Sequence, residues 1–216
     1  MDFDFAALSA EDRYKLLIGL VVPRPIALVT TVSSAGRVNA APFSFFNVLS
    51  DEPPLVIISV DAREEDETVP KDTAVNIGDT GEFVVNLVDE TLLPAMNVCA
   101  VALPAGEDET AYAGLEMARS AKVKPPRIAV APAALECRAW RTIALPGPAR
   151  KLILGEVVQL HVRDDIVDDR LRIDQDRLAL IGRLGGGGSY VRLNERFELK
   201  RLDVADLEAR PAGRRA

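Results

Sequence analysis

The stretch that decides the fold reads Pro23-Arg24-Pro25-Ile26-Ala27-Leu28-Val29-Thr30-Thr31. Its prolines hold the backbone extended, and the β-branched residues that follow favour a strand over residues 26–32. Residues 33–36 read Ser-Ser-Ala-Gly, which is typical of a tight turn, so the chain from Val38 onward is expected to pair back as a hairpin. The sequence therefore begins its main fold with antiparallel β structure.

Outward from this hairpin, most other elements are predicted to be short strands. We expect them at residues 55–60, 83–88, 134–145, 151–162, 190–193 and 197–202. Helices are predicted at residues 9–19 with Ser9 as N-cap, from an Asp72 or Thr73 cap to about Gly78 or Gly81, and at 90–103. This pattern favours a mainly β fold, a closed or partly closed antiparallel barrel with a few decorating α-helices.

The size and composition suit a single domain. The chain has 216 residues, of which 48% are apolar, enough for one core. We assign residues 1–204 to that domain and residues 205–216 to a flexible C-terminal tail.

Charge and residue counts exclude several classes of partner. A formal charge of −7 repels phosphate backbones, so no nucleic acid partner is expected. The N-terminus is acidic where a signal peptide would be basic, and no apolar run reaches the roughly 18 residues that span a bilayer. We therefore expect a cytoplasmic protein, free of membrane, with Cys99 and Cys137 reduced. One histidine and no Cys-x-x-Cys predict that there is no metal site.

The common catalytic motifs are missing from the sequence. We find no P-loop, no dinucleotide-binding glycine pattern before a helix, and no Gly-x-Ser-x-Gly. The acidic runs at 64–67, 164–165 and 168–169 are typical of solvated loops. An enzymatic interpretation therefore requires a cofactor that brings its own chemistry.

Three stretches could together form a site for a phosphate and a flat ring. Arg24 between two prolines presents a guanidinium that can bind phosphate, and Lys71 precedes a helix start, where free N–H groups favour an anion. Thr30 and Thr31 face opposite sides of one strand, and the backbone of residues 43–47 can bind the edge of a heterocycle. Taken singly, each has a structural alternative: an ion pair for Arg24, a solvated side chain for Lys71, helix caps, turns or core for the others. The residues alone therefore indicate a β-rich domain with a phosphate-bearing ligand as one interpretation.

The order of the motifs carries a family resemblance. The segments PRPIALVTT (23–31), NAAPFSFFNVLSDEPPLVIISV (39–60), KDTAVNI (71–77) and GEFVVNLV (81–88) follow one another. Together they resemble the flavin reductase-like, FMN-binding split-barrel family, which includes flavoredoxins. GEVVQLHV (155–162) and RLGGGGSY (183–190) are similar to that family's closing strands. The resemblance covers roughly residues 10–200 and implies a Greek-key-like split β-barrel that forms a homodimer, with FMN in a groove at or near the dimer interface.

The same resemblance assigns site residues. It places Arg24, Thr30 and Thr31 along the phosphate and ribityl side of FMN, Ser44, Phe45 and Asn47 at the isoalloxazine edge, and Lys71, Asp72 and Thr73 near the phosphate. Ser50 and Asn76 match the pattern less closely. His161 has two interpretations: a contact to nicotinamide, as in some relatives, or a structural residue of its strand. The charged segment 61–70 departs from the family pattern and leaves access to the flavin open.

The function implied is an NAD(P)H-dependent flavin reductase, in which NADH or NADPH acts as a transient co-substrate and passes hydride to the flavin. The protein then needs only to position the reactants and tune the ring. Reduced flavin or electrons would pass to a partner monooxygenase or another acceptor. Two alternatives remain: a flavoredoxin-like electron carrier that retains FMN without oxidising nicotinamide, and a non-enzymatic ligand-binding module.

Overall fold

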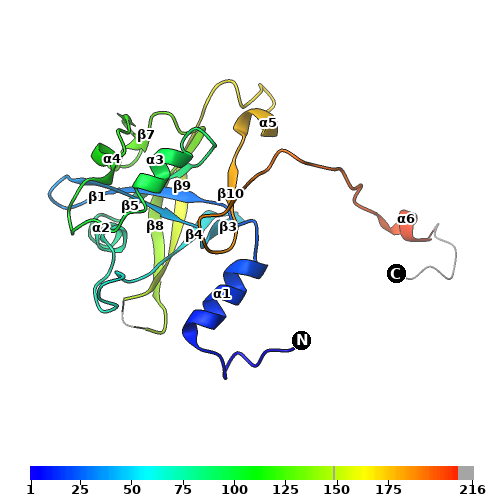
Figure 1. Cartoon of the computed structure of the whole chain (residues 1–216). Coiled ribbons are helices and arrows are strands. Elements are labelled where there is room, and N and C mark those ends of the chain that lie inside the picture. The colour runs from blue at the N-terminus through cyan, green and yellow to red at the C-terminus, as the bar shows by residue number, and fades with distance from the viewer. Residues whose placement is uncertain (148, 209–216) are drawn as a thin grey trace.

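The computed structural model describes residues 1–147 and 149–208. The first helix, α1 (Ala10–Leu20), begins where the sequence predicts, because the Ser9 side chain accepts a hydrogen bond from the N–H of Asp12. After α1 the chain enters a large antiparallel sheet that forms the body of the molecule (Figure 1).

The sheet has seven strands in the order β2-β1-β5-β8-β9-β4-β3. Their bounds are β1 (Ala27–Val32), β2 (Val38–Phe43), β3 (Phe46–Asp51), β4 (Pro54–Val60), β5 (Glu82–Leu87), β8 (Ala133–Ala144) and β9 (Lys151–Val162). The two edge strands, β2 and β3, follow one another in the chain and are separated only by Ser44 and Phe45. The sheet therefore curls back on itself as an open barrel.

The barrel core is made of inward-facing side chains from these strands and from α2 (Asp72–Thr80). Phe83, Ile58 and Val29 are completely buried there, and burial of a side chain of this size contributes about 1.5–3 kcal/mol. A second apolar cluster lies on the other side of β1, where Leu28 packs with Leu92 and with Met96 of α3 (Leu93–Val98).

Short elements complete the fold. They are β6 (Met117–Ala118), β7 (Arg127–Ile128), α4 (Glu109–Tyr112), α5 (Gln175–Leu178), β10 (Ile181–Arg183), β11 (Tyr190–Arg192) and α6 (Val204–Glu208). The β10–β11 hairpin turns through Gly187 and Gly188, both in the left-handed region with φ near +76° and +78°, which glycine adopts without strain. Within the described residues, no helix is long and apolar enough to cross a bilayer.

Several predicted boundaries are wrong. The helix expected over 90–103 is limited to α3 (Leu93–Val98), and a separate short helix, α4, begins at Glu109, whose side chain is buried. Helix α2 has Lys71 as its N-cap instead of Asp72 or Thr73, and it lacks a side-chain cap bond because a lysine ammonium has no acceptor for a helix N–H. The Asp72 carboxylate binds Arg63 and the N–H of Gly106, both outside the helix.

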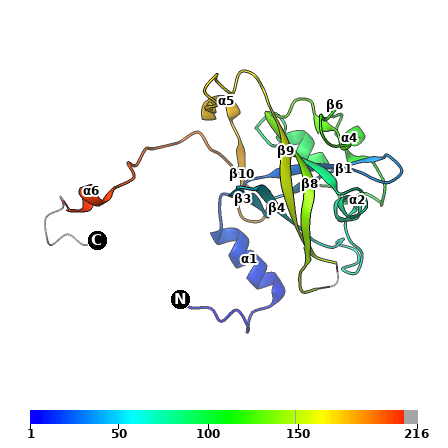
Figure 2. The same ribbon diagram turned by 180° about the vertical axis from the view of Figure 1, so that it is seen from behind.

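Two predictions concern the C-terminal part of the chain, a strand at residues 197–202 and a tail from residue 205. Residues 197–202 form no strand, since no neighbouring strand of the chain supplies their hydrogen bonds. The tail predicted from residue 205 begins inside α6, and residues 209–216 lie outside the described residues. Figure 2 shows the barrel from the opposite side, with the segment after β11 running away from it.

Candidate functional site

A cavity of about 380 Å³ is lined by residues of the barrel and of the elements around it. Its walls come from β2, the N-terminus of α2, the segment after α3, and the β10–β11 hairpin, with Tyr14 of α1 at the rim. These elements are far apart in sequence, and the curled sheet brings them together. The cavity is within the range of about 300–1,000 Å³ that is typical of small-molecule sites.

One wall is the start of α2, and it contains the Lys-Asp-Thr element predicted from the sequence. Lys71, Asp72 and Thr73 all line the cavity. The first turn closes when the N–H of Ala74 donates to the carbonyl of Lys71, at 2.9 Å. The N–H groups of a helix's first turn and the positive end of its dipole attract an anion, so this wall suits a phosphate.

Two loops are joined at this helix start by the Asp72 carboxylate. Arg63 lies in the charged segment 61–70 and pairs with Asp72 at 2.7 Å, while the N–H of Gly106 donates to the other carboxylate oxygen at 2.9 Å. Arg63 also donates to the carbonyl of Leu103. Glu64 and Glu65 follow Arg63 and line the cavity. The charged segment is therefore a wall of the cavity.

Another part of the lining comes from two residues that the sequence analysis did not single out. The Arg183 guanidinium lies over the Tyr190 ring, with its carbon 4.7 Å from the ring centroid, and both side chains line the cavity. Such a stacked pair offers a flat cationic surface. The only signal was the segment RLGGGGSY, whose ends are these two residues.

A buried carboxylate also lines the cavity. One oxygen of Glu109 accepts a hydrogen bond from the N–H of Ala40 at 3.0 Å. Burial raises the pKa of Glu109, and the nearby negative charges of Asp72 and Asp108 act in the same direction. Burial likewise raises the pKa of the neighbouring Cys99 thiol to about 12, which keeps this cavity-lining thiol protonated at neutral pH.

Arg24 lies outside the cavity lining and is engaged with the backbone. Its guanidinium donates to the carbonyls of Ile18 (2.6 Å), Val21 (3.1 Å) and Leu184 (2.7 Å). The remaining contact, from Nε to Ser44 Oγ at 3.3 Å, reaches a residue that does line the cavity. The arginine therefore joins α1, the β10–β11 hairpin and the loop after β2.

Other predicted ligands of the ribityl side lie inside the protein frame. Thr30 Oγ1 donates to the carbonyl of Pro126 and accepts from Asn86, while Thr31 Oγ1 accepts from Asn76 of α2. The two threonines face opposite sides of β1, as expected from strand geometry. Thr30, Thr31 and Asn76 are all buried and outside the cavity lining.

Of the remaining predicted residues, one lines the cavity and the others do not. Ser44 lines the cavity, whereas Phe45, Asn47 and Ser50 lie on or beside the edge strand β3 and outside the lining. The side chains of Asn47 and Ser50 bond to the local backbone of Val48 and Pro53. His161 is on β9 opposite Ala134 of β8, away from the cavity lining, and burial lowers its pKa. The structure thus brings Ser44 together with Lys71, Asp72 and Thr73.

Known proteins are similar to this chain over nearly its whole length. An uncharacterized protein of Halalkalibacterium halodurans is 47% identical over 203 residues, which cover 92% of this chain and 95% of that protein. The crystal structure of nitrilotriacetate monooxygenase component B from Bacillus cereus matches with a TM-score of 0.87 and 37% identity, covering 92% of this chain and 98% of that chain. The 2-nitrobenzoate 2-nitroreductase of Pseudomonas fluorescens matches with a TM-score of 0.84 and 34% identity, covering 94% and 98%.

The fold and its cavity define a class, the split β-barrel proteins, and the expected mainly antiparallel fold class is confirmed. The model of the flavin reductase-like domain matches residues 19–180, and the chain belongs to that family. The family consists of flavin-binding oxidoreductases.

Proposed function

We propose that the chain binds FMN in this cavity and works as an NAD(P)H-dependent flavin reductase. The observation that carries the proposal is that one cavity is lined both by the helix start at Lys71, which suits an anion, and by a flat stacked pair, Arg183 over Tyr190. A ligand that is phosphorylated at one end and planar at the other matches both features.

The residues present fit FMN. Lys71 and the first-turn N–H groups of α2 would hold the phosphate, and Ser44 with the Arg183–Tyr190 pair would hold the ring. Bound FMN supplies the redox chemistry, with NADH or NADPH as the electron donor. The chain's own side chains bind, orient and exclude water: Met96 and Phe43 give the cavity apolar walls. Cys99 takes no part as a nucleophile, because its thiol remains protonated.

The similarity to a monooxygenase component supports a role with a second protein. We propose that reduced flavin or its electrons pass to a monooxygenase or another acceptor, and that this takes place in the cytoplasm.

We further propose that the protein is a homodimer. Val48 on β3 is in register with the buried Val56, so both lie on the same face of the sheet. Yet Val48 is 66% exposed, which leaves an apolar position of an edge strand uncovered within one chain. Contact with a second chain would cover it.

The test is an FMN titration followed by turnover assays on the purified protein. We expect saturable quenching of FMN fluorescence, and oxidation of NADH or NADPH that depends on added or bound flavin. FMN binding without oxidation of either nucleotide would support the flavoredoxin-like carrier instead. If the protein neither binds FMN nor oxidises NADH or NADPH, the proposal is contradicted and only the non-enzymatic ligand-binding module remains.

A further inference from the structure

The segment after β11 is an arm that leaves the barrel. Residues 194–208 extend away from the sheet in both views and end in the short helix α6 (Figures 1 and 2). Within the arm, Lys200 pairs with Asp206 at 3.1 Å, and the Asp206 N–H donates to Asp203. The arm thus has internal order but lies away from its own core.

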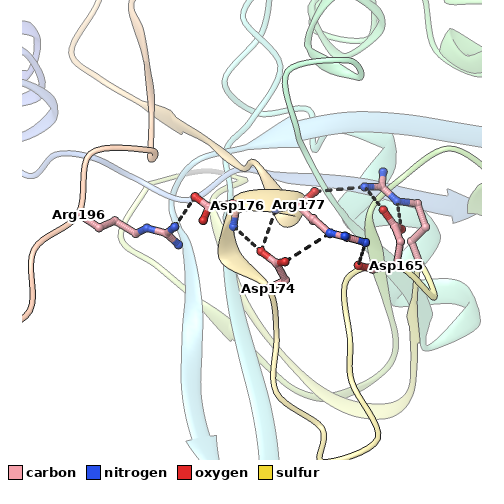
Figure 3. Close-up of polar contacts among 6 residues, drawn as sticks. Asp165, Asp174, Asp176, Arg177 and Arg196 are labelled. Carbon is pink, nitrogen blue, oxygen red and sulfur yellow. Dashed lines mark hydrogen bonds and ion pairs between the residues drawn. The ribbon is translucent and has the colours of Figure 1, made fainter.

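The root of the arm is anchored to the folded body. Arg196 forms an ion pair with Asp176 of α5 (Figure 3). Helix α5 is in turn held by Asp174, which caps it, and by Arg177, which donates to the carbonyl of Asp165 at 3.2 Å. The arm therefore leaves the domain at a set position.

The side chains beyond this anchor alternate in polarity. Phe197 and Leu199 are 91% and 87% exposed, and the charged Glu198 and Lys200 lie between and after them. Alternation with a period of two is the pattern of a strand with one face buried. Leu202, Val204 and Leu207 of the same arm are exposed as well, and exposed apolar groups that cluster mark an interaction site. The pattern therefore favours a surface that the arm's own barrel does not provide.

A matching surface exists on the same chain. Strand β3 is an edge of the sheet, and edge strands present free backbone groups that can pair with another chain. Val48 and Leu49 of β3 are both exposed apolar side chains. Each copy carries one arm and one open edge. In a dimer with a two-fold axis, the arm of each copy can therefore pack against the β3 edge of the other.

We propose that residues 194–208 form an exchange arm, which packs the Phe197–Leu199 face against the β3 edge of a second copy of this chain. The inference deepens the proposed homodimer by naming the segment and the edge that join. It requires no FMN, so its failure is separable from that of the proposed redox function.

The first test compares dimer dissociation constants by sedimentation equilibrium. The variant Phe197→Asp/Leu199→Asp places charges on the apolar face, and Glu198→Gln is the control on the other face, which leaves the Lys200–Asp206 pair in place. We expect the first variant to raise the dissociation constant at least about tenfold and the control to stay within about twofold. A monomeric full chain, or equal constants for both variants, overturns the proposal.

The second test locates the arm. Val48→Cys/Leu199→Cys is oxidised and run on a non-reducing gel, where the native Cys99 and Cys137 are buried and do not compete. A covalent dimer is expected, with Val48→Cys alone as control. Weakened dimerisation in the first test without a covalent dimer here overturns the assignment to β3. FMN titrations and melting curves of the same samples show whether the domain itself is unchanged.

Discussion

Lys71 and Arg24, the two cations chosen from the sequence, have different surroundings in the folded chain. Lys71 is the N-cap of α2 and lines the cavity, whereas Arg24 is buried and donates hydrogen bonds to backbone carbonyls. A cation that binds a phosphate needs N–H donors that are not already engaged within the protein, and Lys71 meets that condition better than Arg24. The two substitutions are therefore expected to have different effects.

Lys71→Ala is expected to raise the FMN dissociation constant roughly ten- to a hundredfold. Losing a charge-assisted hydrogen bond costs about 1.5–3 kcal/mol. Fluorescence titration measures the change, and Lys122→Ala, an exposed lysine outside the cavity lining, is the control. Equal affinities for the two variants would place the phosphate elsewhere.

Arg24→Ala is expected to lower the free energy of unfolding by about 3 kcal/mol or more. Each carbonyl left without its donor costs about 1–3 kcal/mol, and three carbonyls lose Arg24. Urea denaturation of the FMN-free protein gives the value. Arg172→Ala, which removes an exposed partner of Asp168, serves as the comparison and should change little. An unchanged free energy of unfolding together with weaker FMN binding would contradict this expectation and support a contact between Arg24 and the FMN phosphate.

Glu109 gives the folded protein a pH dependence of stability. Because burial raises its folded pKa above the unfolded value, the folded state binds more protons between the two pKa values. Stability from this group is therefore highest at low pH and falls as pH rises through the folded pKa. Glu109→Gln cannot ionise, and its amide oxygen can still accept from Ala40. The variant should gain stability over the wild type between mildly acidic and neutral pH, as urea titrations at several pH values would show; parallel curves contradict this.

At the scale of elements, the barrel depends on one close approach between strands. An added Cβ at Gly155 of β9 would lie 2.3 Å from Phe83 Cζ, inside the core between β5, β8 and β9. An added Cβ at Gly78 of α2 meets no atom within 4 Å. The same substitution therefore tests strand packing at one position and helix propensity at the other.

Gly155→Ala should lower the free energy of unfolding by about 1–3 kcal/mol or more, because the buried Phe83 cannot move aside without strain. Gly78→Ala should raise it by about 0.5–1 kcal/mol, since alanine loses less entropy than glycine at an exposed helix position. Chemical denaturation of both variants measures the two signs. A neutral Gly155→Ala would show that the barrel can widen at this point.

For the whole molecule, the two cysteines report on global opening. Cys99 and Cys137 are both buried, and burial raises the pKa of each thiol. Native protein should therefore react with a thiol-specific disulfide reagent only at the rate of unfolding, and unfolded protein should release two equivalents at once. A thiol that reacts in the native state as fast as a small free thiol would reveal a local opening at its position.

Much of the fold is readable from local sequence patterns. The Ser9 cap, the strand after Pro25 and the turn at residues 33–36 rest on neighbouring residues, and the structure confirms all three. Of the residues proposed for the site from the sequence, Ser44, Lys71, Asp72 and Thr73 line the cavity. Glu109, Arg183 and Tyr190 were missed, because no local pattern indicates that segments so far apart line one cavity.

Backbone propensity and motif order thus set the strands, helix α2 and the family of this chain, since those depend on residues within a few positions of each other. The folded barrel set the role of Arg24, whose partner Leu184 is 160 residues away, and left residues 197–202 unpaired. Hydrogen-bond partners and neighbouring strands depend on packing between residues that are far apart in the sequence. A local sequence pattern shows that a residue or strand needs a partner, but only the tertiary structure determines which residue or strand that partner is.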